Sequence, residues 1–190
     1  MSRSFDLPEV EWATVGTVGE PGHRTFYLQA RQAGELVTLK LEKQQVAALA
    51  QFVGEILSDL PDPDPVPEGD LELTEPLSAE WAVGSIQLAY DSDADRILVI
   101  AEEAVLEEGG GDADDPVLEA ALASPDPGSE PPDDHGVARL GLSRPQAAAL
   151  VRKGWDLVQA GRPTCPLCGN PMDPEGHSCP RTNGHRPPET

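Results

Sequence analysis

A correspondence between two distant parts of the chain constrains its fold more than any other feature. Glu11-Trp12-Ala13 recurs as Glu80-Trp81-Ala82, and residues 41–49 match residues 142–150 at an offset of 101. In the second match, a strand pattern ends at a leucine, Leu41 or Leu142, and a helical pattern rich in alanine follows at once. Two matches in the same order favour an internal duplication, which predicts that both parts of the chain fold alike.

The first unit shows a change of hydrophobic period. Alternating apolar residues and the turn residues between them predict strands at 12–18, 24–31 and 35–41. Residues 43–57 then switch to helical spacing, with one apolar face formed by Val46, Leu49, Val53, Ile56 and Leu57. The first unit therefore has the order β-β-β-α.

The second unit repeats that order. Strands are predicted at 83–90, 96–101 and 137–142, and a helix at 144–159. Ser143 and Gln146 form the sequence signature of a capping box, and Pro145 between them suits the first turn of a helix. These signals place the start of the helix at residue 144.

The predicted fold class is α+β. Three strands and one helix bury too little apolar surface to be stable alone, so we expect the two β-β-β-α repeats to form one pseudo-symmetric domain over residues 1–160. Repeat one spans about 11–58 and repeat two about 80–160. A small zinc-ribbon-like tail, residues 161–190, follows.

Two acidic segments account for most of the charge of −21. Residues 59–80 and 102–134 hold eight and twelve of the 34 acids and no Lys or Arg, so the rest is nearly neutral. Segments 59–79 and 102–134 are predicted to be flexible. The shortage of bases disfavours nucleic acid and anionic membranes as partners, and no apolar run is long enough to span a bilayer.

The chemical signal lies near the C-terminus, where Cys165, Cys168 and Cys179 are the only cysteines of the chain. A Cys-x-x-Cys followed by glycine is typical of a zinc knuckle, because the turn directs both thiolates at one ion. An odd number of cysteines excludes a closed set of disulfides. The absence of a recognisable secretory signal favours a cytoplasmic location with reduced thiols, so we expect structural zinc.

The fourth ligand is not another cysteine, because Thr182 stands where a second Cys-x-x-Cys would end. His177, two residues before Cys179, is the first candidate, His185 is the alternative, and Asp173 is a weaker donor. A redox role for the Cys-x-x-Cys is less favoured, since the motif does not follow a strand in a βαβ unit. A catalytic zinc is also disfavoured, because three thiolates make the ion a poor Lewis acid.

Other motifs carry weaker signals. The glycine-rich stretch 16–22 lacks the Gly-Lys-Ser/Thr ending of a phosphate-binding loop and is predicted to be a hairpin turn. His23 and Arg24 after it are weak candidates for ligand binding. The sequence contains no Gly-x-Ser-x-Gly and no His-Glu-x-x-His. The sequence thus does not favour an enzyme.

The chain resembles an actinobacterial protein family known as domain of unknown function 3090. The resemblance is carried by residues 16–30, by residues 41–46, and most strongly by Ala160-Gly-Arg-Pro163 together with the cysteine motifs up to Gly184. Segments 59–76 and 102–134 carry none of it, and Glu11-Trp12 departs from an expected Arg-Phe. The resemblance implies an intracellular location and a zinc-ribbon-like tail, but no activity.

The leading hypothesis is a non-enzymatic, zinc-stabilised binding or adaptor protein whose partner is another protein. The alternative is an enzyme or small-ligand binder with its site in the groove between the two repeats, lined by His23, Arg24 or Tyr27. A third hypothesis is nucleic-acid contact through the arginines of the tail, although the charge balance makes nucleic acid unlikely.

Overall fold

The structure is a computed structural model of the chain. It describes residues 2–20, 22–61, 71–104, 135–160 and 165–168, together with Met172, Cys179 and Arg181. Residues 62–70 and 105–134, which make up most of the two acidic segments, lie outside the described residues, as do His177 and His185.

The first half contains the predicted strands and helix. β2 (Trp12–Val18), β3 (Thr25–Gln32) and β4 (Glu35–Leu41) form an antiparallel sheet in chain order, and α1 (Lys43–Ser58) follows at once. The strand pairing places Val15 opposite Leu28 and Leu28 opposite Leu39. The predicted alternation of apolar residues is therefore confirmed by the register of this sheet.

The second half contains a second antiparallel sheet with one addition. β5 (Val83–Asp91), β6 (Arg96–Glu103) and β7 (Val137–Ser143) pair in chain order, and α2 (Arg144–Gln159) follows. β1 (Phe5–Leu7), which the sequence reasoning missed, pairs in parallel with β7. A strand of three residues is too short to show a period. The N-terminus of the chain thus completes the sheet of the other half.

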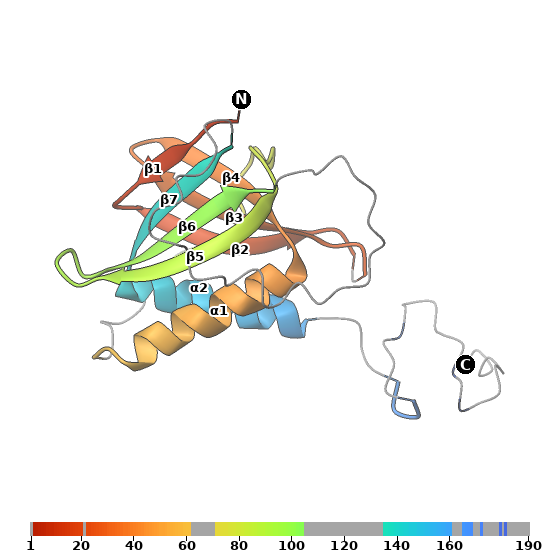
Figure 1. The fold of residues 1–190 in the computed structure, drawn as a ribbon. Coiled ribbons are helices and arrows are strands. Elements are labelled where there is room, and N and C mark those ends of the chain that lie inside the picture. The colour runs from red at the N-terminus through yellow and green to blue at the C-terminus, as the bar shows by residue number, and fades with distance from the viewer. Residues whose placement is uncertain are drawn as a thin grey trace.

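Backbone hydrogen bonds join the two halves at two places. The backbone N–H of Lys40 on β4 donates to the carbonyl of Trp81, at 3.0 Å, just before β5 begins. On the other side, the N–H of Val10 donates to the carbonyl of Gly141 on β7, at 3.1 Å. The strands consequently surround one interior, with the two helices on one side of it (Figure 1).

One apolar core fills this interior. Its centre contains side chains from both sheets and both helices, among which the following are at most 2 % exposed: Leu7, Val15, Leu28, Leu39, Val46, Leu49, Ile97, Val99, Leu140, Leu142 and Leu150. Burying each of these side chains contributes about 1.5–3 kcal/mol. The core therefore belongs to neither half alone, as the small size of each unit led us to expect.

A glutamine at the start of each helix ties it to the other half. Gln45 and Gln146 complete capping boxes with Glu42 and Ser143, which confirms the box predicted at Ser143. The Gln45 amide also donates to the carbonyl of Val83, at 2.9 Å. The Gln146 amide donates to the carbonyl of Val10, also at 2.9 Å. Each helix thus begins with a glutamine that donates a hydrogen bond to the other half of the chain. The duplication itself stays a prediction.

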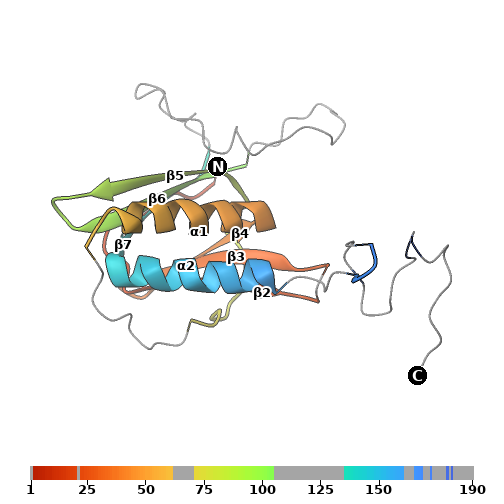
Figure 2. The same ribbon diagram turned by 90° about the horizontal axis from the view of Figure 1, so that it is seen from below.

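The helices lie side by side and run antiparallel (Figure 2). A Cβ atom added at Gly154 would lie 3.1 Å from the Cβ of Ala50, and one added at Gly54 would lie 3.7 Å from Cγ1 of Val151. Close approach of this kind needs small residues at the crossing. The glycines of α1 and α2 therefore set the distance between the helices.

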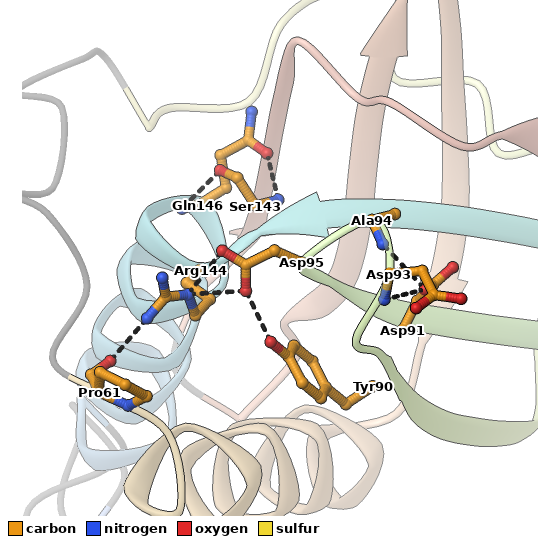
Figure 3. A network of polar contacts seen from close by, with 9 residues as sticks. All are labelled: Pro61, Tyr90, Asp91, Asp93, Ala94, Asp95, Ser143, Arg144 and Gln146. Atoms are coloured by element: carbon orange, nitrogen blue, oxygen red, sulfur yellow. Dashed lines mark hydrogen bonds and ion pairs between the residues drawn. The ribbon is translucent and has the colours of Figure 1, made fainter.

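A polar network fixes the β5–β6 turn to the start of α2 (Figure 3). The Tyr90 hydroxyl donates to Oδ1 of Asp95 at 2.7 Å, and Nε of Arg144 lies 2.9 Å from the same oxygen. These contacts lower the pKa of Asp95, the hydrogen bond from Tyr90 contributing most. Arg144 also donates to the carbonyl of Pro61, at 2.8 Å. Arg144 thus links the β5–β6 turn to Pro61, three residues after the end of α1.

Residues 71–74 cross the outer face of the first sheet, a contact that the sequence reasoning missed. The Gln29 amide donates to the carbonyl of Thr74 and accepts from its N–H, both at 2.8 Å. The hydroxyl of Thr14 donates to the carbonyl of Leu71. The Leu73 side chain occupies the space that a side chain at Gly16 would need. This crossing explains why the outward-facing Thr14 and Gln29 are fully buried.

Replacing Gln29 with leucine should lower the free energy of unfolding by about 2–4 kcal/mol. The substitution removes two hydrogen bonds to the backbone of Thr74 and one to the hydroxyl of Thr38, and each intramolecular hydrogen bond contributes about 0.5–1.5 kcal/mol. Chemical denaturation gives the value. Gln51→Leu on the exposed side of α1 is the control and should change stability by less than about 0.5 kcal/mol. Equal effects at the two positions would contradict the contact.

Alanine should stabilise the helix pair more at Gly54 than at Gly154. Alanine is favoured over glycine inside a helix by about 0.5–1 kcal/mol, and at Gly54 the new methyl group meets only ordinary contact distances. At Gly154 the contact with Ala50 opposes that gain. Thermal unfolding of both variants measures the difference. A larger gain at Gly154 would show that the helices are not held as close as described.

Candidate metal centre

Three cysteine sulfurs gather at one point in the C-terminal part of the chain. The Sγ atoms of Cys165, Cys168 and Cys179 all lie within 4.8 Å of one another. Cys165 and Cys179 are buried, with 6 % and 7 % of their surface exposed, and Cys168 is half-buried. The structure therefore brings together all three predicted thiol ligands.

The distances fit a metal ion better than a disulfide. Sγ of Cys165 and Sγ of Cys179 are 3.9 Å apart, whereas a disulfide requires about 2.05 Å. A tetrahedral zinc with Zn–S bonds of about 2.3 Å separates two sulfurs by about 3.8 Å. None of the three cysteines forms a disulfide. The three thiols are close enough together to bind one metal ion.

The turn of the Cys-x-x-Cys motif prepares one of these thiols to ionise. The backbone N–H groups of Cys168 and Leu167 point at the Cys165 sulfur, and they lower the pKa of this thiol. Metal binding requires the thiolate, so a donor-lined turn stabilises the form that binds. The local backbone thus favours the ligand chemistry predicted from the spacing.

The candidates for a fourth ligand lie outside the described residues. His177, His185 and Asp173 are all in that part of the tail. The three sulfurs leave one corner of a tetrahedron for a nitrogen or oxygen donor. The choice between His177 and His185 therefore stays a prediction.

Arg24, a weak candidate for ligand binding, contacts the end of α2. Its Nη1 donates to the carbonyl of Ala160, at 2.8 Å, and Ala160 is the C-terminal cap of α2. A cation at this position also complements the negative end of the helix dipole. His23 beside it is exposed in the turn, where its backbone N–H donates to the carbonyl of Glu20. Arg24 therefore joins the β2–β3 hairpin to the end of α2.

The space between the two halves is apolar. Leu28, Leu39 and Ile97, from both sheets, are at most 1 % exposed there. Tyr27 lies between the buried Phe26 and Leu28 on β3, so it points to the opposite face of its sheet. Tyr27 therefore does not face the interior between the two halves, while a ligand site at His23 or Arg24 stays a prediction.

One residue of the centre was not singled out from the sequence. Leu167, between the two cysteines of the motif, is 54 % exposed, the highest value among the exposed large hydrophobic residues of the described chain. The sequence does show an apolar residue between the two cysteines of the motif, which could have marked Leu167. The turn therefore exposes the apolar side chain of Leu167 to solvent.

Replacing Arg24 with alanine should lower stability by about 1 kcal/mol, because α2 loses a charged hydrogen-bond donor at its C-terminal cap. Urea denaturation measures this loss. His23→Ala is the matched control in the same turn and should be close to neutral. If Arg24 bound an anion instead, added inorganic phosphate would raise the unfolding temperature of the wild type and not of Arg24→Ala. We expect no such difference.

Comparison with known proteins agrees with the resemblance found in the sequence. The sequence model of one family, described as protein of unknown function (DUF3090), matches residues 4–179. That range includes both sheets, both helices and all three cysteines. No curated protein and no solved structure matches the chain. In the described part of the chain, no helix is long and apolar enough to cross a membrane. The chain belongs to the DUF3090 family.

Proposed function

We propose that this protein is a cytoplasmic, non-enzymatic binding or adaptor protein whose C-terminal tail is ordered by one structural zinc ion. The observation that carries the proposal is the gathering of Cys165, Cys168 and Cys179, with their sulfurs within 4.8 Å of one another. The tail is a small zinc-ribbon-like unit, and the body is a duplicated α+β domain.

The donor set supports zinc in a structural role. Thiolate sulfur with one imidazole nitrogen is a common ligand set of closed, tetrahedral zinc sites. A structural zinc supplies folding free energy to a segment too short to form a core of its own. His177 provides the fourth ligand in this proposal, with His185 as the alternative. The ion holds the two parts of the motif, which are separated by ten residues, at one point.

Binding is favoured over catalysis by what surrounds the sulfurs. A catalytic zinc keeps one position open to water and uses a nearby acid or base. Three thiolates instead place much negative charge on the ion, which lowers its power to activate water. The chain holds 13 Lys and Arg against 34 Asp and Glu, a balance that disfavours nucleic acid and anionic membranes as partners. We therefore propose another protein as the partner.

Elemental mass spectrometry of the purified full chain tests the site. We expect one zinc per chain in the wild type and loss of most of it in Cys168→Ala, because two thiolates and one histidine bind zinc much more weakly. His177→Ala should also lose zinc, while His185→Ala should keep it. His135→Ala, far from the motif in sequence, is the control and should retain the full amount.

The same measurement separates the alternatives. Loss of zinc in His185→Ala but not in His177→Ala would assign the fourth ligand to His185 and leave the proposal intact. A wild-type chain purified without metal that also fails to take up added zinc would contradict it. Zinc retained in Cys168→Ala would contradict it as well, since the ion would then be held elsewhere.

A further inference from the structure

The exposed large hydrophobic residues of the described chain are three. Val18 is 45 % exposed at the end of β2, Trp155 is 37 % exposed on α2, and Leu167 is 54 % exposed in the cysteine motif. Two of them belong to the body and one to the tail.

The two exposed residues of the body lie at the same end of it. Val18 pairs with Thr25 at the tip of the β2–β3 hairpin, next to Arg24. Arg24 in turn donates to Ala160, five residues after Trp155 on the same helix. The hairpin tip and the C-terminal end of α2 share one end of the body in both views (Figures 1 and 2). The tail begins from this end.

The covalent connection keeps the cysteine motif within reach of that end. Cys165 is five residues after Ala160, so the two Cα atoms are at most about 18 Å apart along an extended chain. Trp155 lies only about 7.5 Å below Ala160 along the helix axis, at 1.5 Å per residue. Leu167, two residues beyond Cys165, can therefore reach the exposed face of Trp155.

The apolar surface formed by Trp155 and Val18 is small, and its size indicates what kind of segment can bind there. One tryptophan and one valine offer far less than the roughly 1,200 Å² that a stable interface between separate proteins buries. A tethered segment differs, because a short linker gives it an effective concentration of about millimolar. A contact too small to hold a separate chain is thus sufficient for a segment of the same chain.

We propose that the zinc-loaded cysteine motif docks on the body of its own chain, with Leu167 packed against Trp155 and Val18. This inference rests on the proposed zinc site, because the ion is what would fix the turn that presents Leu167. Zinc binding in the tail then stabilises the body, and the docked tail places the metal unit at a fixed position beside the β2–β3 hairpin.

Thermal unfolding of the full chain with and without zinc tests the docking. Zinc should raise the unfolding temperature of the body in the wild type by about 2–4 °C, the shift expected for a contact of about 1 kcal/mol in a chain of this size. In Leu167→Ser and in Trp155→Ser the rise should vanish, although both variants still bind one zinc. Leu167→Met is the matched control and should keep the rise.

Acrylamide quenching of tryptophan fluorescence gives a second, direct measurement. Subtracting the signal of Trp155→Phe from that of the wild type isolates Trp155 from Trp12 and Trp81. Zinc should reduce the quenching of Trp155 in the wild type and in Leu167→Met. In Leu167→Ser the quenching should be the same with and without zinc.

Each other outcome overturns the inference in a recognisable way. One bound zinc per chain, with no rise in unfolding temperature and no change in quenching, would leave the zinc site standing and remove the docking. A rise that depends on protein concentration would mean that two copies make the contact between them. A chain that binds no zinc would remove both the site and the docking.

Discussion

Burial of the inner faces of two small sheets against each other and against two helices is the interaction on which the structure depends. A three-stranded sheet with one helix leaves much of its apolar face in water and is marginal by itself. Here Leu28 and Leu39 of the first sheet and Ile97 and Leu140 of the second share one interior, each at most 1 % exposed. Neither half is expected to persist without the other.

The polar contacts between the halves follow from that shared core. Once the helices pack side by side, the Gln45 side chain donates to Val83 at the start of β5. The Gln146 side chain donates to Val10, two residues before β2. β1 then fills the edge of β7 in the opposite half. Each of these contacts satisfies backbone groups that the apolar packing would otherwise leave without partners. The chain closes on itself because its first strand pairs with its last strand.

Much of this fold was predictable from local pattern, and the exceptions have identifiable causes. The strands and helices show clear periods, as in the alternation at Val37, Leu39 and Leu41, and the structure places their bounds within two residues of the predicted ones. β1 is too short to show a period. The crossing at residues 71–74 depends on Gln29 and Gly16, which are far away in sequence. Long-range pairing of this kind leaves no periodic signal in either segment.

The candidate site divides in the same way. Its three sulfur donors followed from spacing alone, because a Cys-x-x-Cys turn and a third cysteine nearby are a local signal. The choice of a fourth donor did not, since His177 and His185 are both close to Cys179 in the sequence. Arg24 was a weak candidate for ligand binding because it follows a glycine-rich turn, and only the fold shows its contact with Ala160.

X-ray absorption at the zinc edge of the purified full chain tests the central claim most directly, because it reports the atoms bound to the ion. The account predicts three sulfur ligands at about 2.3 Å and one nitrogen at about 2.0–2.1 Å. A first shell dominated by oxygen and nitrogen, with fewer than three sulfurs, would contradict it and remove the cysteine centre as the basis of the tail's structure.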